Sequence, residues 1–261
     1  TKLISLLPNH PSVVFIHGMW GGQWIWQNYM EYFFNAGYNI YSINLSGFKK
    51  RSAPSTIGKI SFKDYLSEVE ILLNNVSNPI LIGHSSGALL ACKVAEFIKI
   101  QALILLSPAP PKGILGPYSP RLLLTVIKNF FNAFMSLSFM PSKKDMILLG
   151  LHQFERSEQQ KLLVKFSPES GKFAKQIGLF GIPILPSKID CPTVVVSGGK
   201  DQTIHPGMAK KVARKLNSTY KQFENFGHLI TLEDGWEETA DFILNWIRKQ
   251  KSEEKKNAKS E

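Results

Sequence analysis

The residues Pro79–Leu90 constrain this chain most, because they join an apolar strand, a tight Gly-x-Ser-x-Gly turn and the start of an apolar helix. In such a turn the serine takes a strained backbone conformation, and glycine at Gly83 and Gly87 leaves room for strand and helix to pass closely. The helix that starts at Ser86 directs free N–H groups toward negative charge beside the serine. The pattern predicts that Ser85 is a nucleophile, whereas a plain glycine-serine turn is the alternative.

Short apolar runs alternate with helical patterns on both sides of this turn. Parallel sheets have this alternation, because each crossover between parallel strands needs a connection that is usually a helix. The sequence therefore predicts an α/β fold with a mostly parallel central sheet of about six strands and helices on both faces. The other expected strands are Val13–Ile16, Tyr38–Asn44, Ala102–Leu106, Thr193–Val196 and Tyr220–Phe223, and the expected helices are Trp24–Ala36, a capped helix from Ser61, Gly207–Leu216 and Gly235–Arg248.

The alternation stops between residues 113 and 186, where helical patterns follow one another at Pro120–Met140 and Met146–Gln153. An insertion at the edge of the sheet where Ser85 emerges is placed to cover a site there. We therefore predict a core made of residues 1–112 and 187–250, a helical cap at 113–186 and a flexible charged tail at 251–261.

The apolar run Leu122–Met135 lies within the expected cap. It is interrupted by Lys128, Asn129 and Asn132 before it reaches the roughly 20 residues of a membrane span, so no transmembrane segment is expected. A cap helix that faces a lipophilic pocket is the favoured interpretation, and binding at a membrane surface is the alternative.

The formal net charge of +11 raises the question of an anionic partner. The lysines are scattered over the helices and the charged end, which argues against a nucleic-acid partner and leaves a weak attraction to membrane surfaces. Cys92 and Cys191 follow no metal or disulfide spacing, and no basic-then-apolar segment opens the chain, so a cytoplasmic location is expected. No motif predicts a metal ion or a cofactor, and the oligomeric state stays open.

A serine hydroxyl attacks only when a base takes its proton and an acid orients that base. Asp201 follows the strand Thr193–Val196 and His228 follows the last expected strand, so both should lie at the sheet edge where Ser85 emerges. These three residues are the expected catalytic residues. Taken alone, Asp201 also suits a turn and His228 a surface loop. Asp190 is a rival acid, but it precedes its strand.

The loop His17–Gly22 follows the first clear strand and should supply a second part of the site. Acyl transfer passes through an oxyanion that two backbone N–H groups can stabilise, and those of Met19 and Ser86 are the expected donors. His17 should hold the loop by hydrogen bonds. Trp20 is interpreted either as a substrate contact or as a core residue.

At this point the chain resembles the α/β-hydrolase superfamily, from about Val13 to Ile247. The residues that carry the resemblance are His17–Trp20, the turn Gly83–Gly87, Gly199–Asp201 and Gly227-His228. The loop Asn44–Ser52 departs from the superfamily pattern, which has an aspartate at the position of Asn44 and a second glycine near Lys49.

Within the superfamily, the loop His17–Trp26 is similar to that of the plant methylesterase and hydroxynitrile lyase group. The lyases have a threonine where this chain has Gly18 and a lysine where it has Leu229, so the resemblance implies hydrolysis rather than cyanohydrin cleavage. Superfamily dehalogenases and epoxide hydrolases use an aspartate nucleophile, which Ser85 disfavours.

The sequence thus predicts a carboxylesterase that cleaves a small-molecule ester with a lipophilic portion, through Ser85, His228, Asp201 and an acyl-enzyme. A thioesterase, an acyltransferase or a carbon–carbon bond hydrolase would use the same three residues. A non-enzymatic ligand receptor of the same fold is the alternative from another functional class.

Overall fold

The computed structural model of the protein describes residues 2–3, 10–46, 54–117 and 119–257. The described strands of the main sheet lie in the order β1-β3-β2-β4-β5-β8-β9. Their bounds are β1 (Lys2–Leu3), β2 (Ser12–Ile16), β3 (Asn39–Ile43), β4 (Ile80–His84), β5 (Ala102–Leu106), β8 (Thr193–Gly198) and β9 (Thr219–Phe223). The neighbours from β3 to β9 pair in parallel, while β1 is antiparallel to β3. The predicted α/β fold with about six parallel strands is confirmed.

The strand register brings the predicted site loops to one edge of the sheet. Ile16 lies opposite Gly83, Gly83 opposite Leu105, and Leu105 opposite Val195, so these strands end close together. The loops that leave β2, β4, β8 and β9 at their carboxyl ends therefore meet above the same edge, where open parallel sheets bind ligands.

Helices cover both faces of the sheet because successive strand side chains point to opposite faces. Val14 and Leu81 pack with α3 (Phe62–Leu73), α4 (Ser86–Val94) and α9 (Pro206–Lys215) on one face. Phe15 and Ile82 pack on the other face with α1 (Gln27–Asn35) and α10 (Trp236–Asn257). A 3₁₀ turn at Gln23–Trp26 leads into α1.

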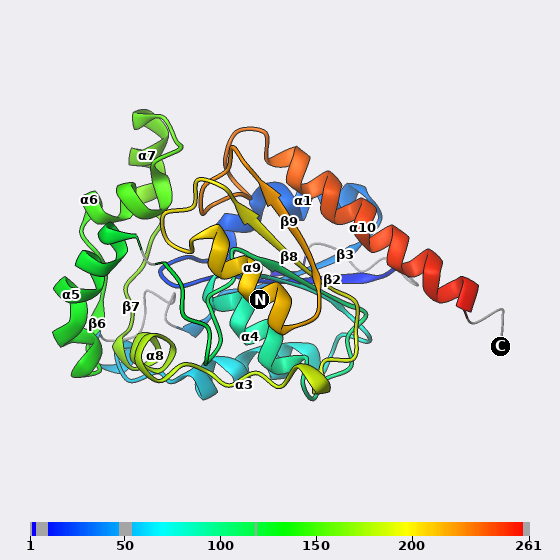
Figure 1. The fold of residues 1–261 in the computed structure, drawn as a ribbon, viewed down its shortest axis with the longest axis horizontal. Coiled ribbons are helices and arrows are strands. Elements are labelled where there is room, and N and C mark those ends of the chain that lie inside the picture. The colour runs from blue at the N-terminus through cyan, green and yellow to red at the C-terminus, as the bar shows by residue number, and fades with distance from the viewer. Residues whose placement is uncertain (1, 4–9, 47–53, 118, 258–261) are drawn as a thin grey trace.

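Between β5 and β8 the chain forms a mainly helical segment beside the sheet (Figure 1). We keep 113–186 as the proposed limits of the cap and call these residues the insertion. No helix in the described part of the chain is long and apolar enough to span a membrane. The elements of this region are α5 (Pro120–Phe134), β6 (Ser138–Phe139), α6 (Lys143–Met146), a π-helical turn (Ile147–Leu151), α7 (Arg156–Leu163), β7 (Glu169–Ser170), α8 (Gly171–Lys175), a second π-helical turn (Gln176–Phe180) and a 3₁₀ turn (Pro186–Lys188).

The start of α3 follows the sequence, whereas α5 ends early. Ser61 accepts from the Asp64 N–H and the Asp64 carboxylate accepts from the Ser61 N–H, which is the expected capping arrangement. Helix α5 ends at Phe134 instead of continuing to Met140. The reason is that Ser136 takes a left-handed backbone conformation (φ 55°), after which the chain enters β6.

The last helix is longer than the sequence predicts, because α10 ends at Asn257 instead of Arg248. Its residues include neither glycine nor proline, and Lys249 and Glu253 approach to 3.9 Å one turn apart. The helix therefore extends through the charged residues, and the tail predicted to be flexible from residue 251 is helical as far as Asn257. Residues 258–261 lie outside the described part of the chain.

The loop Asn44–Ser52, where the sequence departs from the superfamily, is described only as far as Ser46. Its residues 47–52 lie outside the described part of the chain. A short helix, α2 (Pro54–Ile57), follows.

Candidate active site

The Gly-x-Ser-x-Gly turn has the strained geometry that the sequence predicts. Ser85 lies between β4 and α4 with φ 54° and ψ −121°, a region that residues with side chains rarely occupy. A Cβ atom at Gly83 would lie 2.6 Å from Ala88 Cα, and one at Gly87 would collide with the carbonyl oxygens of Ile16 and His17. The close passage of strand and helix therefore requires both glycines.

Asp201 and His228 form a hydrogen bond although they are 27 positions apart in the sequence. His228 Nδ1 donates to Asp201 Oδ2 at 2.8 Å, and the other oxygen, Oδ1, accepts from the N–H groups of Thr203 and Ile204, both at 2.8 Å. Burial by itself would raise the pKa of Asp201, but His228 and the two N–H groups outweigh it and lower that pKa. Asp201 is therefore an ionised acceptor that fixes the His228 ring and leaves Nε2 without its proton.

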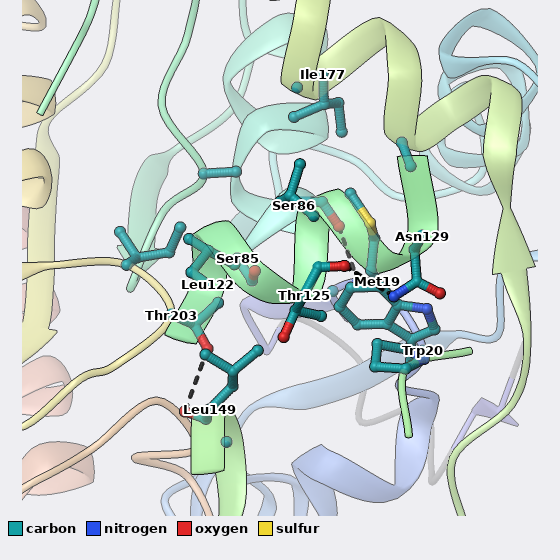
Figure 2. A pocket seen from close by; sticks show the side chains of 18 of the residues that line it. Met19, Trp20, Ser85, Ser86, Leu122, Thr125, Asn129, Leu149, Ile177 and Thr203 are labelled. Atoms are coloured by element: carbon teal, nitrogen blue, oxygen red, sulfur yellow. Dashed lines mark hydrogen bonds between the residues drawn. The ribbon is translucent and has the colours of Figure 1, made fainter. Parts of the chain in front are cut away.

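A cavity of about 430 Å³ joins the parts of the site, since both Ser85 and His228 line it. Met19, Trp20 and Ser86 line the same cavity, and Figure 2 shows them gathered around Ser85. The structure thus places the predicted nucleophile, base and oxyanion loop around one space, with Asp201 buried behind His228.

The predicted oxyanion donors are adjacent, but one already has an acceptor. The Met19 N–H donates to Ser86 Oγ at 2.9 Å. Binding of an oxyanion by this N–H therefore requires the Ser86 hydroxyl to turn away. The backbone of this loop also passes close to Ser85 at Gly18, because a Cβ atom at Gly18 would lie 2.8 Å from Ser85 Cβ.

Two buried histidines hold these loops in place. His17 Nδ1 donates to the Gly18 carbonyl at 2.8 Å, and His17 Nε2 accepts from the Leu45 N–H at 3.1 Å. His84 Nε2 donates to the His228 carbonyl at 2.9 Å. Burial lowers the pKa of His17 to about 4 and that of His84 to about 3, so both rings are neutral at neutral pH. His17 thus has the structural part that the sequence predicts.

Glu233 is a residue of the site that sequence reasoning missed. It is 4% exposed, and its carboxylate accepts from the N–H groups of Gly227 at 2.6 Å and Leu229 at 3.0 Å, on either side of His228. Burial raises the pKa of Glu233 to about 7; the two N–H groups lower it and the charge of Asp201 raises it. The available sequence signal was an acidic residue directly after Leu229–Leu232, a segment that is apolar except for Thr231.

Glu169 was also missed, and it ties the insertion to the oxyanion loop. It accepts from the Tyr65 hydroxyl at 2.6 Å and from the Ser170 N–H at 2.7 Å, and burial raises its pKa to about 6. Nearby, the Trp20 carbonyl accepts from the Ser167 N–H at 3.0 Å, and the Trp20 ring meets Phe139 edge-on at 5.7 Å. Trp20 therefore lines the cavity and contacts the insertion at once.

Comparison with known proteins agrees with the fold described above. The profile of a family described as "Alpha/beta hydrolase family" matches residues 13–242. The chain is 22% identical to epoxide hydrolase 3 of Mus musculus over 227 residues, which cover 79% of this chain and 61% of that protein. It thus spans less than two thirds of the length of this curated relative.

Solved structures of similar fold include three proteins that this chain nearly spans. Polyneuridine aldehyde esterase matches with a TM-score of 0.70 and 15% identity, over 91% of this chain and 99% of that one. Methylesterase MES16 from Arabidopsis has a TM-score of 0.72 and 17% identity, over 91% and 99%. MenH from S. aureus has a TM-score of 0.72 and 22% identity, over 96% and 98%. At these identities the similarity shows a shared fold.

Proposed function

Because this chain belongs to the alpha/beta hydrolase family, we propose that it is a serine hydrolase that cleaves a carboxylic ester with a lipophilic portion. The observation that carries the proposal is the cavity shared by Ser85 and His228, with His228 held by a buried, ionised Asp201. Membership of the family supports hydrolysis, and the carboxylic ester as the substrate is what we propose beyond it.

The geometry supports the following reaction. His228 Nε2 takes the proton of the Ser85 hydroxyl while Oγ attacks the ester carbonyl, and Asp201 stabilises the imidazolium that forms. The backbone N–H groups of Ser86 and Met19 hold the oxyanion, each worth about 3 kcal/mol of transition-state stabilisation. His228 then protonates the leaving alcohol, and water, activated by the same ring, releases the acid from Ser85.

The lining of the cavity supports a lipophilic substrate. It is mainly apolar and includes Val126, Phe139, Ile177 and Leu229. The side chains of Thr125, Asn129 and Thr203 supply a few polar groups. Apolar walls with few polar groups are typical of sites that bind small apolar ligands and orient them through a few hydrogen bonds.

Ser85 also separates the proposal from epoxide hydrolysis, the activity in the name of the mouse relative. The superfamily resemblance assigns an aspartate nucleophile to epoxide hydrolases, and this chain has a serine at that position. Thioester cleavage, acyl transfer and carbon–carbon bond cleavage use the same three residues and stay as alternatives, as does ligand binding without turnover. A reducing, cytoplasmic location belongs to the proposal too, and the free thiols of Cys92 and Cys191 support it.

A fluorophosphonate probe tests the proposal directly. It should label the wild type and the control Ser77→Ala, whose serine is exposed, and it should leave Ser85→Ala unlabelled. Labelling that persists in Ser85→Ala would show that this serine is not the nucleophile. A series of p-nitrophenyl esters of increasing acyl length then tests the lipophilic portion, with faster turnover expected for longer chains than for acetate.

A further inference from the structure

Helix α5 lines the cavity with some of its side chains and exposes other large apolar side chains on the outside. Thr125 and Asn129 face the cavity, where their polar groups bond to carbonyls of the same helix at 3.0 and 2.9 Å. An amphipathic helix on the surface of a globular protein normally turns its aliphatic and aromatic side chains toward the protein interior. Instead, four large apolar side chains are 56–69% exposed, and we call them the outer face of α5: Leu124, Ile127, Phe131 and Phe134.

The outer face of α5 is part of a larger apolar surface. An aromatic side chain presents roughly 150–250 Å², so Phe131 and Phe134 alone expose on the order of 200 Å². Leu123, Val126 and Phe130 beside them are each about half exposed. Soluble monomers rarely expose a large contiguous apolar surface, and such surfaces mark interaction sites. The seven large apolar side chains on this one helix, each 47–69% exposed, therefore indicate an interaction site. Helix α5 lies at the margin of the molecule, away from the sheet (Figure 1).

This surface runs into the mouth of the cavity. Leu123, Val126 and Phe130 line the cavity as well as being half exposed, so they form its rim. The Phe130 and Phe134 rings stack with their centroids 5.9 Å apart, which joins the rim to the outer face of α5. An apolar molecule held at the outer face would therefore have a continuous apolar path toward Ser85.

Positive charge accompanies the apolar surface. The insertion has nine basic and four acidic residues, a formal charge of +5 out of +11 for the chain. Lys128 and Arg121 are exposed on α5 itself, and Lys175 Nζ lies 5.7 Å above the Phe134 ring.

The acidic side chains of the insertion offset this charge only in part. Asp145 is buried and neutralises Lys128 at 3.0 Å, whereas Glu169 is buried against Tyr65 and pairs with none of the three cations named above. Glu155 and Glu158 lie at the start of α7. A second copy of the chain docked on the same face would bring two insertions of like charge together, which is unfavourable. An anionic lipid surface offers both apolar contact and opposite charge.

We infer that the outer face of α5 docks on an anionic lipid bilayer, with Ile127 and Phe131 inserted among the acyl chains and the side chains of Arg121 and Lys175 at the headgroups. The mouth of the cavity then opens at the bilayer. A lipophilic ester passes from the membrane along Leu123, Val126 and Phe130 to Ser85. This last statement rests on the proposed function, whereas the docking itself does not.

Vesicle flotation with the full chain tests the docking. Vesicles of phosphatidylcholine with an equal share of phosphatidylglycerol should retain the protein about tenfold better than phosphatidylcholine alone, and 1 M NaCl should weaken this preference. Ile127→Ser combined with Phe131→Ser should lower binding by about tenfold. The matched control combines Ile71→Ser with Phe97→Ser. These two residues lie outside the insertion and are 66% and 54% exposed, so this variant should bind vesicles like the wild type.

The remaining outcomes separate docking from catalysis. Ser85→Ala should float with anionic vesicles as the wild type does, whatever its activity. The Ile127, Phe131 double variant should lose turnover of a long-chain ester dispersed in these vesicles and keep turnover of dissolved p-nitrophenyl acetate. Equal binding to neutral and anionic vesicles, unchanged binding of the double variant, or a wild-type dimer that this variant dissociates would each overturn the inference. A floating protein without esterase activity would overturn only the proposed function.

Discussion

Replacement of Glu233 by glutamine tests how a buried carboxylate supports the loop that holds His228. The pKa of Glu233 rises from 4.5 to about 7 in the folded protein, chiefly through burial. Each pKa unit corresponds to about 1.4 kcal/mol, so ionised Glu233 costs the folded state about 3 kcal/mol. Glutamine has nearly the same shape and never ionises.

The sign of the effect follows from proton binding. Between pH 4.5 and 7 the folded protein keeps a proton on Glu233 that the unfolded chain has lost, so the wild type loses stability as the pH rises through this range. The free energy of unfolding of wild type minus that of Glu233→Gln should therefore fall by about 3 kcal/mol between pH 4.5 and 8. The lowered pKa values of His17 and His84 produce the opposite trend, but it cancels in this difference.

Urea unfolding of both proteins at several pH values between 4.5 and 8 measures this difference, with the exposed Glu31→Gln as the control that should show no trend. A constant difference across the range would refute the reasoning, because it would mean that folding does not raise the pKa of Glu233. Turnover of a p-nitrophenyl ester adds a second readout. If Glu233 positions His228, the variant should lower kcat more than it raises KM.

Three further predictions follow from single contacts. In Asp201→Asn the amide oxygen would keep the Thr203 and Ile204 N–H groups, and the NH₂ group would face His228 and force its ring into the wrong tautomer. Ester turnover should fall about 10³–10⁴-fold with an unchanged circular dichroism spectrum, and a loss under tenfold would contradict this. Gly87→Ala should destabilise the fold by about 3 kcal/mol or more in urea unfolding, because its Cβ meets two carbonyl oxygens, whereas Gly150→Ala, with open space around it, should not; equal stabilities would contradict it. Glu169→Ala should cost about 2 kcal/mol by removing the acceptor of the Tyr65 hydroxyl and the Ser170 N–H; a thermal melt unchanged from the wild type would disprove this.

Local chemistry explains why so much of the core could be predicted. The turn Gly83–Gly87 has few physical solutions, since its two glycines and its strained serine fit only a tight bend between strand and helix. The capping pair Ser61 and Asp64 marks the start of α3 from four adjacent residues. The parallel direction of the strands followed from the alternation, and it placed the loops of Asp201 and His228 at the sheet edge where Ser85 lies. The spatial order of the strands came from the structure.

Long-range contacts decided the rest. The sequence predicts that the apolar helix α5 faces a lipophilic pocket, and Leu122 and Val126 do line the cavity. The second apolar face, with Ile127 and Phe131 exposed, was not predicted. Glu233 and Glu169 have no short motif, because their partners are backbone N–H groups and a hydroxyl from other loops. The same is true of the Met19 N–H, whose acceptor is a side chain 67 residues away.

The amino-acid sequence by itself predicted the parallel sheet and the serine turn, because the alternation of strands and helices and the spacing of the glycines are local patterns. It predicted the three residues expected to act there from their places after parallel strands. Only the tertiary structure showed which side chains of α5 are exposed to water, which carboxylates are buried and which atom accepts from the Met19 N–H. Those features depend on the environment that distant segments create, and burial and orientation of a side chain are properties of that environment rather than of the residue.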